Sequence, residues 1–130
     1  MLVVDASVAV TACLATDGFS SFGSEQLVAP PLLWPESRSA LHVMAFRGEE
    51  LPEVARSAAE RLDAAPIEAH DPAQLGREAW RLADQLGWAK TYDAEYLALA
   101  RLLDCRLVTL DARLRRGADR LGFVVSPTEL

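Results

Sequence analysis

The sequence is poor in cysteine, and its two cysteines stand far apart. Cys13 and Cys105 lie in apolar helical and strand contexts and show no zinc-ligand spacing. Isolated cysteines of this kind usually behave as small buried hydrophobic residues. We therefore expect two free, buried thiols and a protein of a reducing compartment, the cytoplasm, rather than a disulfide-rich secreted domain.

Long apolar runs and an excess of positive charge are also missing. The apolar segment 6–15 is too short to span a bilayer, and the residues before it include no lysine or arginine of the kind that opens a signal peptide. The formal net charge is −6. This acidity excludes a protein that grips nucleic acid through a broad basic surface, because phosphate neutralisation dominates such binding. A localised nucleic-acid site stays open.

What the chain does have is enough apolar sequence for a core, since 51% of its 130 residues are hydrophobic. We expect a single domain over 1–130. Short β-rich runs alternate with helical patterns. The expected strands are 2–4, 26–29, 66–70, 106–110 and 123–125, and the expected helices are 7–14, 35–47, 52–64, 72–86, 93–104 and 112–121. This alternation predicts an α/β fold, a three-layer α/β/α sandwich with a central, mostly parallel sheet.

The expected helix 93–104 is apolar nearly all round. Leu99 and Leu102 lie on the side opposite Ala100, so both sides need cover. Either a homodimer or a second helix of the same chain would supply it.

Four acidic residues are predicted to gather at one edge of the sheet. Asp5 and Asp111 follow the first and fourth strands, and Glu36 and Asp93 stand at the starts of two helices, on their apolar sides. Ligands of open α/β sheets bind outside the carboxyl ends of the strands, where the strand order reverses. We therefore expect these four carboxylates to lie close together.

An alternative explanation exists for each acid taken singly. Aspartate is a favoured N-cap, and Asp5, Asp93 and Asp111 each precede a helical run; Glu36 in a first turn complements the helix dipole. Together, however, four carboxylates would repel one another unless a cation shared their pocket. A hard divalent ion, Mg²⁺ or Mn²⁺, held by carboxylate oxygens and waters is the natural partner.

Four segments of the chain resemble a known family. The opening LVVDASV (2–8), the Pro-Glu pair at 35–36, YDAEYLALA (92–100) and LVTLD (107–111) are together similar to the PIN-domain ribonucleases, specifically the VapC-type toxins of bacterial toxin–antitoxin pairs. The resemblance spans almost the whole chain, and the two late segments are its most specific parts. It implies a PIN-like fold and a metal-dependent endoribonuclease that leaves 5′-phosphate and 3′-hydroxyl ends.

The resemblance also implies roles for individual residues. Asp5 and Asp93 match the principal metal ligands, and Glu36 and Asp111 match acids that complete the site or orient the attacking water. Ser7 and Thr109 match hydroxyl positions beside it. The implied partners are an RNA substrate, a small antitoxin whose tail wraps the toxin, and a second copy in a homodimer.

Basic residues close to these acids are candidates for binding RNA. Arg113, Arg115, Arg116 and Arg120 follow Asp111, and of these Arg113 and Arg116 are our candidates for substrate contact. A solvated helix face explains the cluster equally well. Lys90 and Trp88 depart from the family pattern, in which small or uncharged residues are expected, and Lys90 would contact RNA, a carboxylate or only water.

Histidine and tryptophan offer weaker signals. His42 and His70 have no metal-ligand spacing and are expected to be structural or exposed. Trp34, Trp80 and Trp88 are expected to anchor the core or a groove rather than to stack on bases, because they do not alternate with basic residues.

Two rival functions remain at this point. One is an Mg²⁺-binding phosphoryl-transfer or receiver-like α/β domain; it fits less well because Asp5 is not followed by the second aspartate of an Asp-x-Asp phosphatase and no aspartate ends the third strand. The other is a catalytically inactive PIN-like binding module, against which the four acids argue.

Overall fold

The computed structural model describes residues 1–130 and contains a five-stranded sheet. The strands are β1 (Leu2–Val4), β2 (Leu27–Ala29), β3 (Ile67–Ala69), β4 (Arg106–Val108) and β5 (Val124–Val125). Their order is β3-β2-β1-β4-β5, and all four neighbouring pairs are parallel. The predicted α/β class and parallel sheet are confirmed. β1 and β2 are buried along their whole length, as strands covered on both faces should be.

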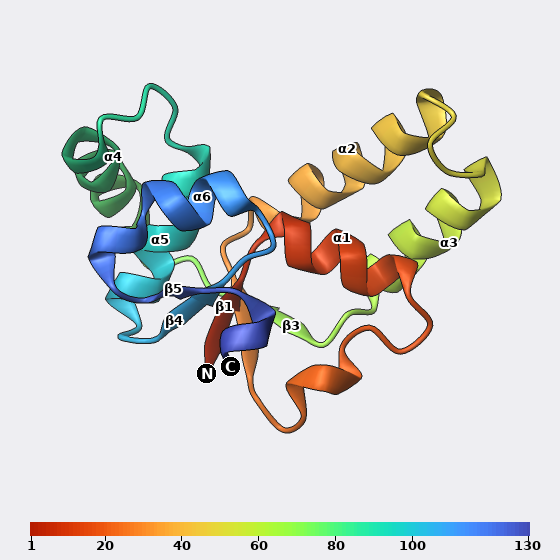
Figure 1. The fold of residues 1–130 in the computed structure, drawn as a ribbon, viewed down its shortest axis with the longest axis horizontal. Helices are drawn as coiled ribbons and strands as arrows, with labels where there is room; N and C mark the ends of the chain where they lie inside the picture. Colours follow the sequence, from red (N-terminus) through yellow and green to blue (C-terminus); the bar gives the residue numbers. More distant parts are fainter.

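Helices cover both faces of this sheet. They are α1 (Ala6–Leu14), α2 (Leu33–Phe46), α3 (Pro52–Asp63), α4 (Leu75–Leu86), α5 (Tyr92–Leu102) and α6 (Ala112–Gly117). Figure 1 shows α1, α2 and α3 grouped on one side of the strands and α4 and α5 on the other. The three-layer prediction is confirmed. None of the six is long and apolar enough to cross a membrane.

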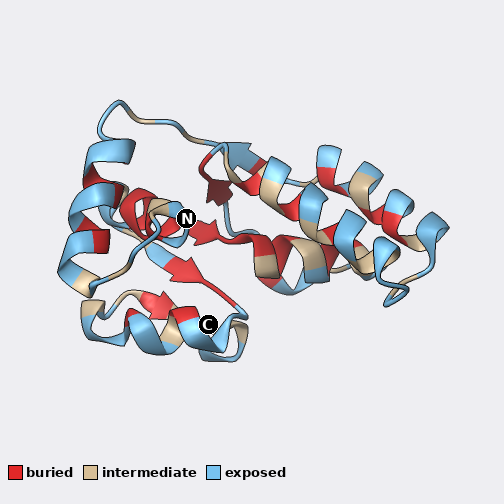
Figure 2. Cartoon of the chain, turned by 90° about the horizontal axis from the view of Figure 1, so that it is seen from above, coloured by how far each residue is buried: buried red, intermediate tan, exposed pale blue.

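The hydrophobic core is centred on the strands and on α5. Figure 2 shows the buried positions concentrated in the strands and on the inward sides of the helices, with exposed residues along their outer sides. In α5, Tyr96, Leu97 and Leu99 have no exposed surface. This helix packs against β1 and β4, and α4 covers it from the other side. The neighbouring helix therefore accounts for most of the apolar circumference of α5, including Leu99, whereas Leu102 is 38% exposed. The homodimer stays a prediction.

Some element boundaries differ from the sequence prediction. α4 begins at Leu75 rather than Pro72, because a turn closed by the Leu75 N–H on the Pro72 carbonyl comes first. α2 begins two residues early, at Leu33. α6 ends at Gly117, and a separate 3₁₀ turn, η2 (Asp119–Leu121), follows it.

The strand order fixes where a site can form. From β1 the chain moves outward through β2 to β3, and then returns to place β4 on the opposite side of β1. The order thus reverses between β1 and β4, the position at which open α/β sheets bind ligands. The loops after these two strands carry Asp5 and Asp111.

Gly18, just after α1, lies too close to that helix for any side chain. A Cβ added there would collide with the backbone of Ala12, whereas one added at Gly76 in α4 would meet nothing within 4 Å. We expect Gly18→Ala to lower the free energy of unfolding by about 1–3 kcal/mol, as overpacking does. Gly76→Ala should be neutral or slightly stabilising, because alanine favours helix. Urea denaturation measures both, and equal stability of the two variants would contradict this packing.

Candidate active site

Asp5 follows β1 directly and is almost completely buried, with 4% of its surface exposed. Its Oδ1 accepts hydrogen bonds from the Ser7 hydroxyl at 2.6 Å and from the Val8 N–H at 3.2 Å, and its Oδ2 accepts one from the Thr109 hydroxyl. Burial raises the pKa of Asp5, and these hydrogen bonds partly offset that rise. The carboxylate is therefore held in one orientation at the start of α1.

Two hydroxyls join the ends of β1 and β4. Ser7 Oγ and Thr109 Oγ1 lie 3.4 Å apart; Ser7 Oγ also accepts the Leu110 N–H at 2.9 Å, and Thr109 Oγ1 accepts the Asp111 N–H at 3.0 Å. The structure thus places both predicted hydroxyls against Asp5. Their role in a reaction stays a prediction.

The N-cap explanation holds for two of the three aspartates. Asp5 caps α1, and Asp111 Oδ1 caps α6 by accepting the N–H groups of Arg113 at 2.9 Å and Leu114 at 3.3 Å. Asp93, however, lies inside the first turn of α5, whose N-cap is Thr91. The residue is exposed, and its carboxylate, partly covered at the pocket, makes neither a hydrogen bond nor an ion pair within the chain. Asp93 therefore has no partner within the chain, and its one structural role is that of an acid in the first turn of a helix.

Three of the four predicted acids line one pocket. Glu36, Asp93 and Asp111 share a cavity of about 600 Å³ that lies between α2, α5 and the start of α6. Partial burial raises the pKa of Asp93, and the charge of Asp111 raises it further, while Arg113 lowers it. Burial likewise raises the pKa of Glu36, with additional repulsion from Asp93 and Asp5. The buried Asp5 thus belongs to the same group of interacting carboxylates.

Tyr96 is a member of this site that sequence reasoning missed. Its hydroxyl donates to Glu36 Oε1 at 2.7 Å, and its side chain is fully buried. Burial and the neighbouring carboxylate raise the pKa of the phenol, so it stays a neutral donor. The available signal was its position three residues after Asp93, on the same face of α5.

Carboxylate oxygens are suitable ligands for a hard divalent ion, although those of this pocket do not form a complete coordination shell. No three histidine, cysteine, aspartate or glutamate side chains are arranged to hold an ion by themselves. Mg²⁺, however, usually keeps several waters and needs only one or two protein carboxylates. The carboxylates of this pocket therefore fit a hydrated ion better than a fully coordinated one.

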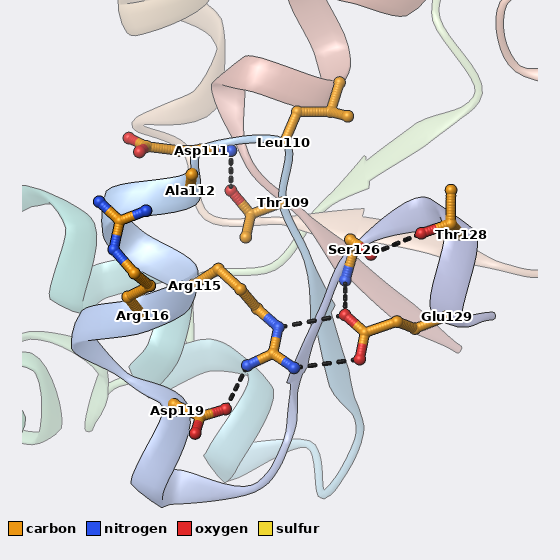
Figure 3. Close-up of a pocket in the computed structure, with 10 residues that line it drawn as sticks. All are labelled: Thr109, Leu110, Asp111, Ala112, Arg115, Arg116, Asp119, Ser126, Thr128 and Glu129. Atoms are coloured by element: carbon orange, nitrogen blue, oxygen red, sulfur yellow. Dashed lines mark hydrogen bonds and ion pairs between the residues drawn. The ribbon is translucent and has the colours of Figure 1, made fainter.

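The arginines after Asp111 have separate environments. Figure 3 shows the Arg115 guanidinium between Glu129 and Asp119, with which it forms ion pairs. Arg120 donates to the Gln85 carbonyl. Arg113 and Arg116 are exposed, and their guanidinium groups have no partner in the chain; Arg113 lines the acidic pocket. Only these two of the four arginines are free to meet a substrate.

The predictions for the tryptophans and histidines have different outcomes. Trp34 and Trp88 pack against the core, as expected, but Trp80 on α4 is 68% exposed, because it lies on the outer side of that helix. Of the two places predicted for Trp80, the core or a groove, the core is therefore wrong. His42 is exposed, and His70 lies on the surface with Nε2 3.4 Å from Glu68.

Comparison with known sequences places this geometry in a family. The family model of the PIN domain matches residues 2–120. The chain is 34% identical over 116 residues to VapC ribonuclease Mb0985 of Mycobacterium bovis, with 88% of each chain covered. The same figures hold for Ribonuclease VapC9 of Mycobacterium tuberculosis.

Solved structures show the same fold. PAE2754 from Pyrobaculum aerophilum superposes with a TM-score of 0.77 at 23% identity, covering 98% of this chain and 91% of that one. VapC20 of Mycobacterium tuberculosis, described as a sarcin-ricin loop cleaving toxin, gives a TM-score of 0.65 at 18% identity, covering 95% and 97%. The chain belongs to the PIN-domain family and, within it, to the VapC ribonucleases.

Proposed function

We propose that the protein is a metal-dependent endoribonuclease toxin that hydrolyses RNA phosphodiester bonds. The observation that carries this proposal is the group of four mutually repelling carboxylates at the β1–β4 reversal of a VapC-family chain. Asp5, Glu36, Asp93 and Asp111 belong to four different segments, and Asp93 has no structural partner that would explain its position. Their shared environment supports a cation-dependent reaction.

Mg²⁺ or Mn²⁺ is the cofactor that we propose. Asp93 and Asp5 would be its principal ligands, with Glu36 and Asp111 as further ligands or as acceptors for its waters. When bound, the ion would supply charge for the scissile phosphate and lower the pKa of a coordinated water. Since Asp5 is fixed by three hydrogen bonds, it would keep its position, whereas Asp93, which no hydrogen bond holds, would adjust to the ion.

The chain's own groups have further roles in this proposal. Glu36, oriented by Tyr96, would accept a proton from the attacking water, because a raised pKa makes a carboxylate a better base. Ser7 and Thr109 would keep Asp5 in place. Arg113 and Arg116 would bind phosphate oxygens beside the pocket.

The rival functions explain the structure less well. A receiver-like domain has the strand order 2-1-3-4-5, with the third strand near the centre, whereas β3 lies at the edge here. An inactive binding module would have no need for four carboxylates that destabilise one another.

Family membership also supports the partners we propose, a small antitoxin and an RNA substrate, both met in the cytoplasm. A negative pocket would attract a basic antitoxin segment and speed its arrival. We retain the homodimer as a proposal that analytical ultracentrifugation can test.

The activity prediction concerns Asp93→Asn. This change removes one charged ligand without altering the size of the side chain, so Mg²⁺-dependent cleavage of end-labelled RNA should fall by at least about 100-fold, beyond the range seen for groups that only support ligands. Glu60→Gln, on the exposed surface of α3, removes the same charge elsewhere and should keep full activity. Unimpaired cleavage by Asp93→Asn would refute the assignment.

A stability prediction follows from the same substitution in metal-free protein. The folded-state pKa of Asp93 is raised, so its ionised form opposes folding above the unfolded pKa, and this cost disappears as the carboxyl is protonated on acidification. Asp93→Asn should therefore melt higher than wild type at pH 7, by about 2 °C because solvent screens an open site. The difference should vanish below about pH 4. A variant that melts lower at pH 7 would contradict the repulsion.

Tyr96→Phe tests the orientation of Glu36. Loss of the hydrogen bond to a charged group corresponds to about 1.5–3 kcal/mol. We expect kcat to fall roughly 10- to 150-fold, with little change in KM, since the phenol does not line the pocket. Tyr92→Phe, which also removes a hydroxyl next to this site, is the matched control and should leave kcat unchanged. Equal kcat for Tyr96→Phe and wild type would exclude this role.

A further inference from the structure

We infer that the ring of Tyr92 is a stacking platform for an unpaired base of the RNA, beside the scissile phosphate. This inference rests on the proposed ribonuclease function and adds a residue that contacts the substrate. It concerns a residue that no step of the proposed reaction uses.

The position of Tyr92 is the first observation. It is the first residue of α5, adjacent to Asp93, and it lines the same pocket as Glu36, Asp93 and Asp111. Its side chain is 57% exposed and does not belong to the hydrophobic core, and its hydroxyl has no hydrogen-bond partner. A large ring thus lies unpacked at the edge of the acidic pocket.

Two tryptophans can be compared with Tyr92 in the exposure of their rings and in their position relative to the pocket. Trp88 lines the same pocket but packs against the core, and its ring lies 3.2 Å from the position of a Cβ at Gly117. Trp88 is thus held against the core, and only part of its side chain is exposed. Trp80 is more exposed than Tyr92, at 68%, but it lies on α4 and does not line this pocket. Tyr92 alone combines an uncovered ring with the site.

The charges around Tyr92 match the other part of a nucleotide. Lys90 and Arg113 line the pocket, and neither side chain forms an ion pair or a hydrogen bond within the chain. Two free cations and an aromatic face are the combination with which proteins bind single-stranded nucleic acid, phosphates on the cations and bases on the ring. A base within a duplex has no free face for such contact, so the ring can stack only on an unpaired base.

The test measures binding in the cleavage-deficient Asp93→Asn background. The probe is a mixed-sequence single-stranded RNA of about 12 nucleotides containing 2-aminopurine, whose fluorescence is quenched on stacking. Because base–aromatic stacking corresponds to about 1–3 kcal/mol, Tyr92→Leu should weaken binding roughly 5- to 150-fold and abolish the quench. Tyr92→Phe should keep both, and so should Trp80→Leu.

The same RNA annealed to its complement should bind more weakly than the single strand. Its affinity should not change with Tyr92→Leu. Thermal melting checks that each variant is folded, and Tyr92→Gln removes the ring in a second way.

Several outcomes would overturn the inference. Undiminished binding by Tyr92→Leu and Tyr92→Gln would exclude stacking and leave Tyr92 as a contact for a protein partner. Loss of binding in Tyr92→Phe would assign the effect to the hydroxyl instead. These results are distinct from failure of the proposed function, which cleavage by the protein with Asp93 intact tests: RNA cleavage together with normal binding by Tyr92→Leu overturns only the stacking.

Discussion

Four carboxylates lie at one edge of a parallel sheet, and their mutual repulsion determines what kind of site this edge can form. β1 and β4 are neighbours and run in the same direction, so the residues that follow them emerge together. That arrangement brings Asp5 and Asp111 close, and the first turns of α2 and α5 add Glu36 and Asp93. Partial burial then deprives these groups of the water that would screen their charges. A bound cation is the simplest means of relieving this cost.

The fold tolerates this electrostatic repulsion because the hydrophobic core lies directly beneath the site and stabilises it. Thirty buried residues form one hydrophobic cluster, and α5 contributes both to it and to the acidic pocket. Along this one helix, Asp93 faces the pocket, Tyr96 reaches Glu36, and Leu97 and Leu99 pack inside. Chemistry and packing are therefore coupled, and a substitution within α5 has to be examined for both.

Periodicity in the sequence was sufficient for the fold, because alternating strands and helices leave few arrangements open. The expected positions of all four acids followed from the same reasoning, because strand ends and helix starts meet at one edge of the sheet, whereas their individual roles came from family resemblance. Contacts between side chains distant in sequence were not accessible. The hydrogen bond from Tyr96 to Glu36 joins residues 60 positions apart in the sequence, and it depends on how α5 faces α2. Likewise, Arg115 differs from its neighbour Arg116 because it pairs with Asp119, one helical turn away, and with Glu129, which the last segment of the chain brings against it.

The most direct test of this account is a carbon-detected NMR titration of the side-chain carboxyl groups. In metal-free protein, the pKa values of Glu36 and Asp93 should lie above the ordinary values of glutamate and aspartate, and Mg²⁺ or Mn²⁺ should lower them. The carboxyl of Glu60, exposed on α3, should not respond to the ion. Ordinary pKa values for Glu36 and Asp93, unchanged by either metal, would contradict the claim that repelling acids define this site.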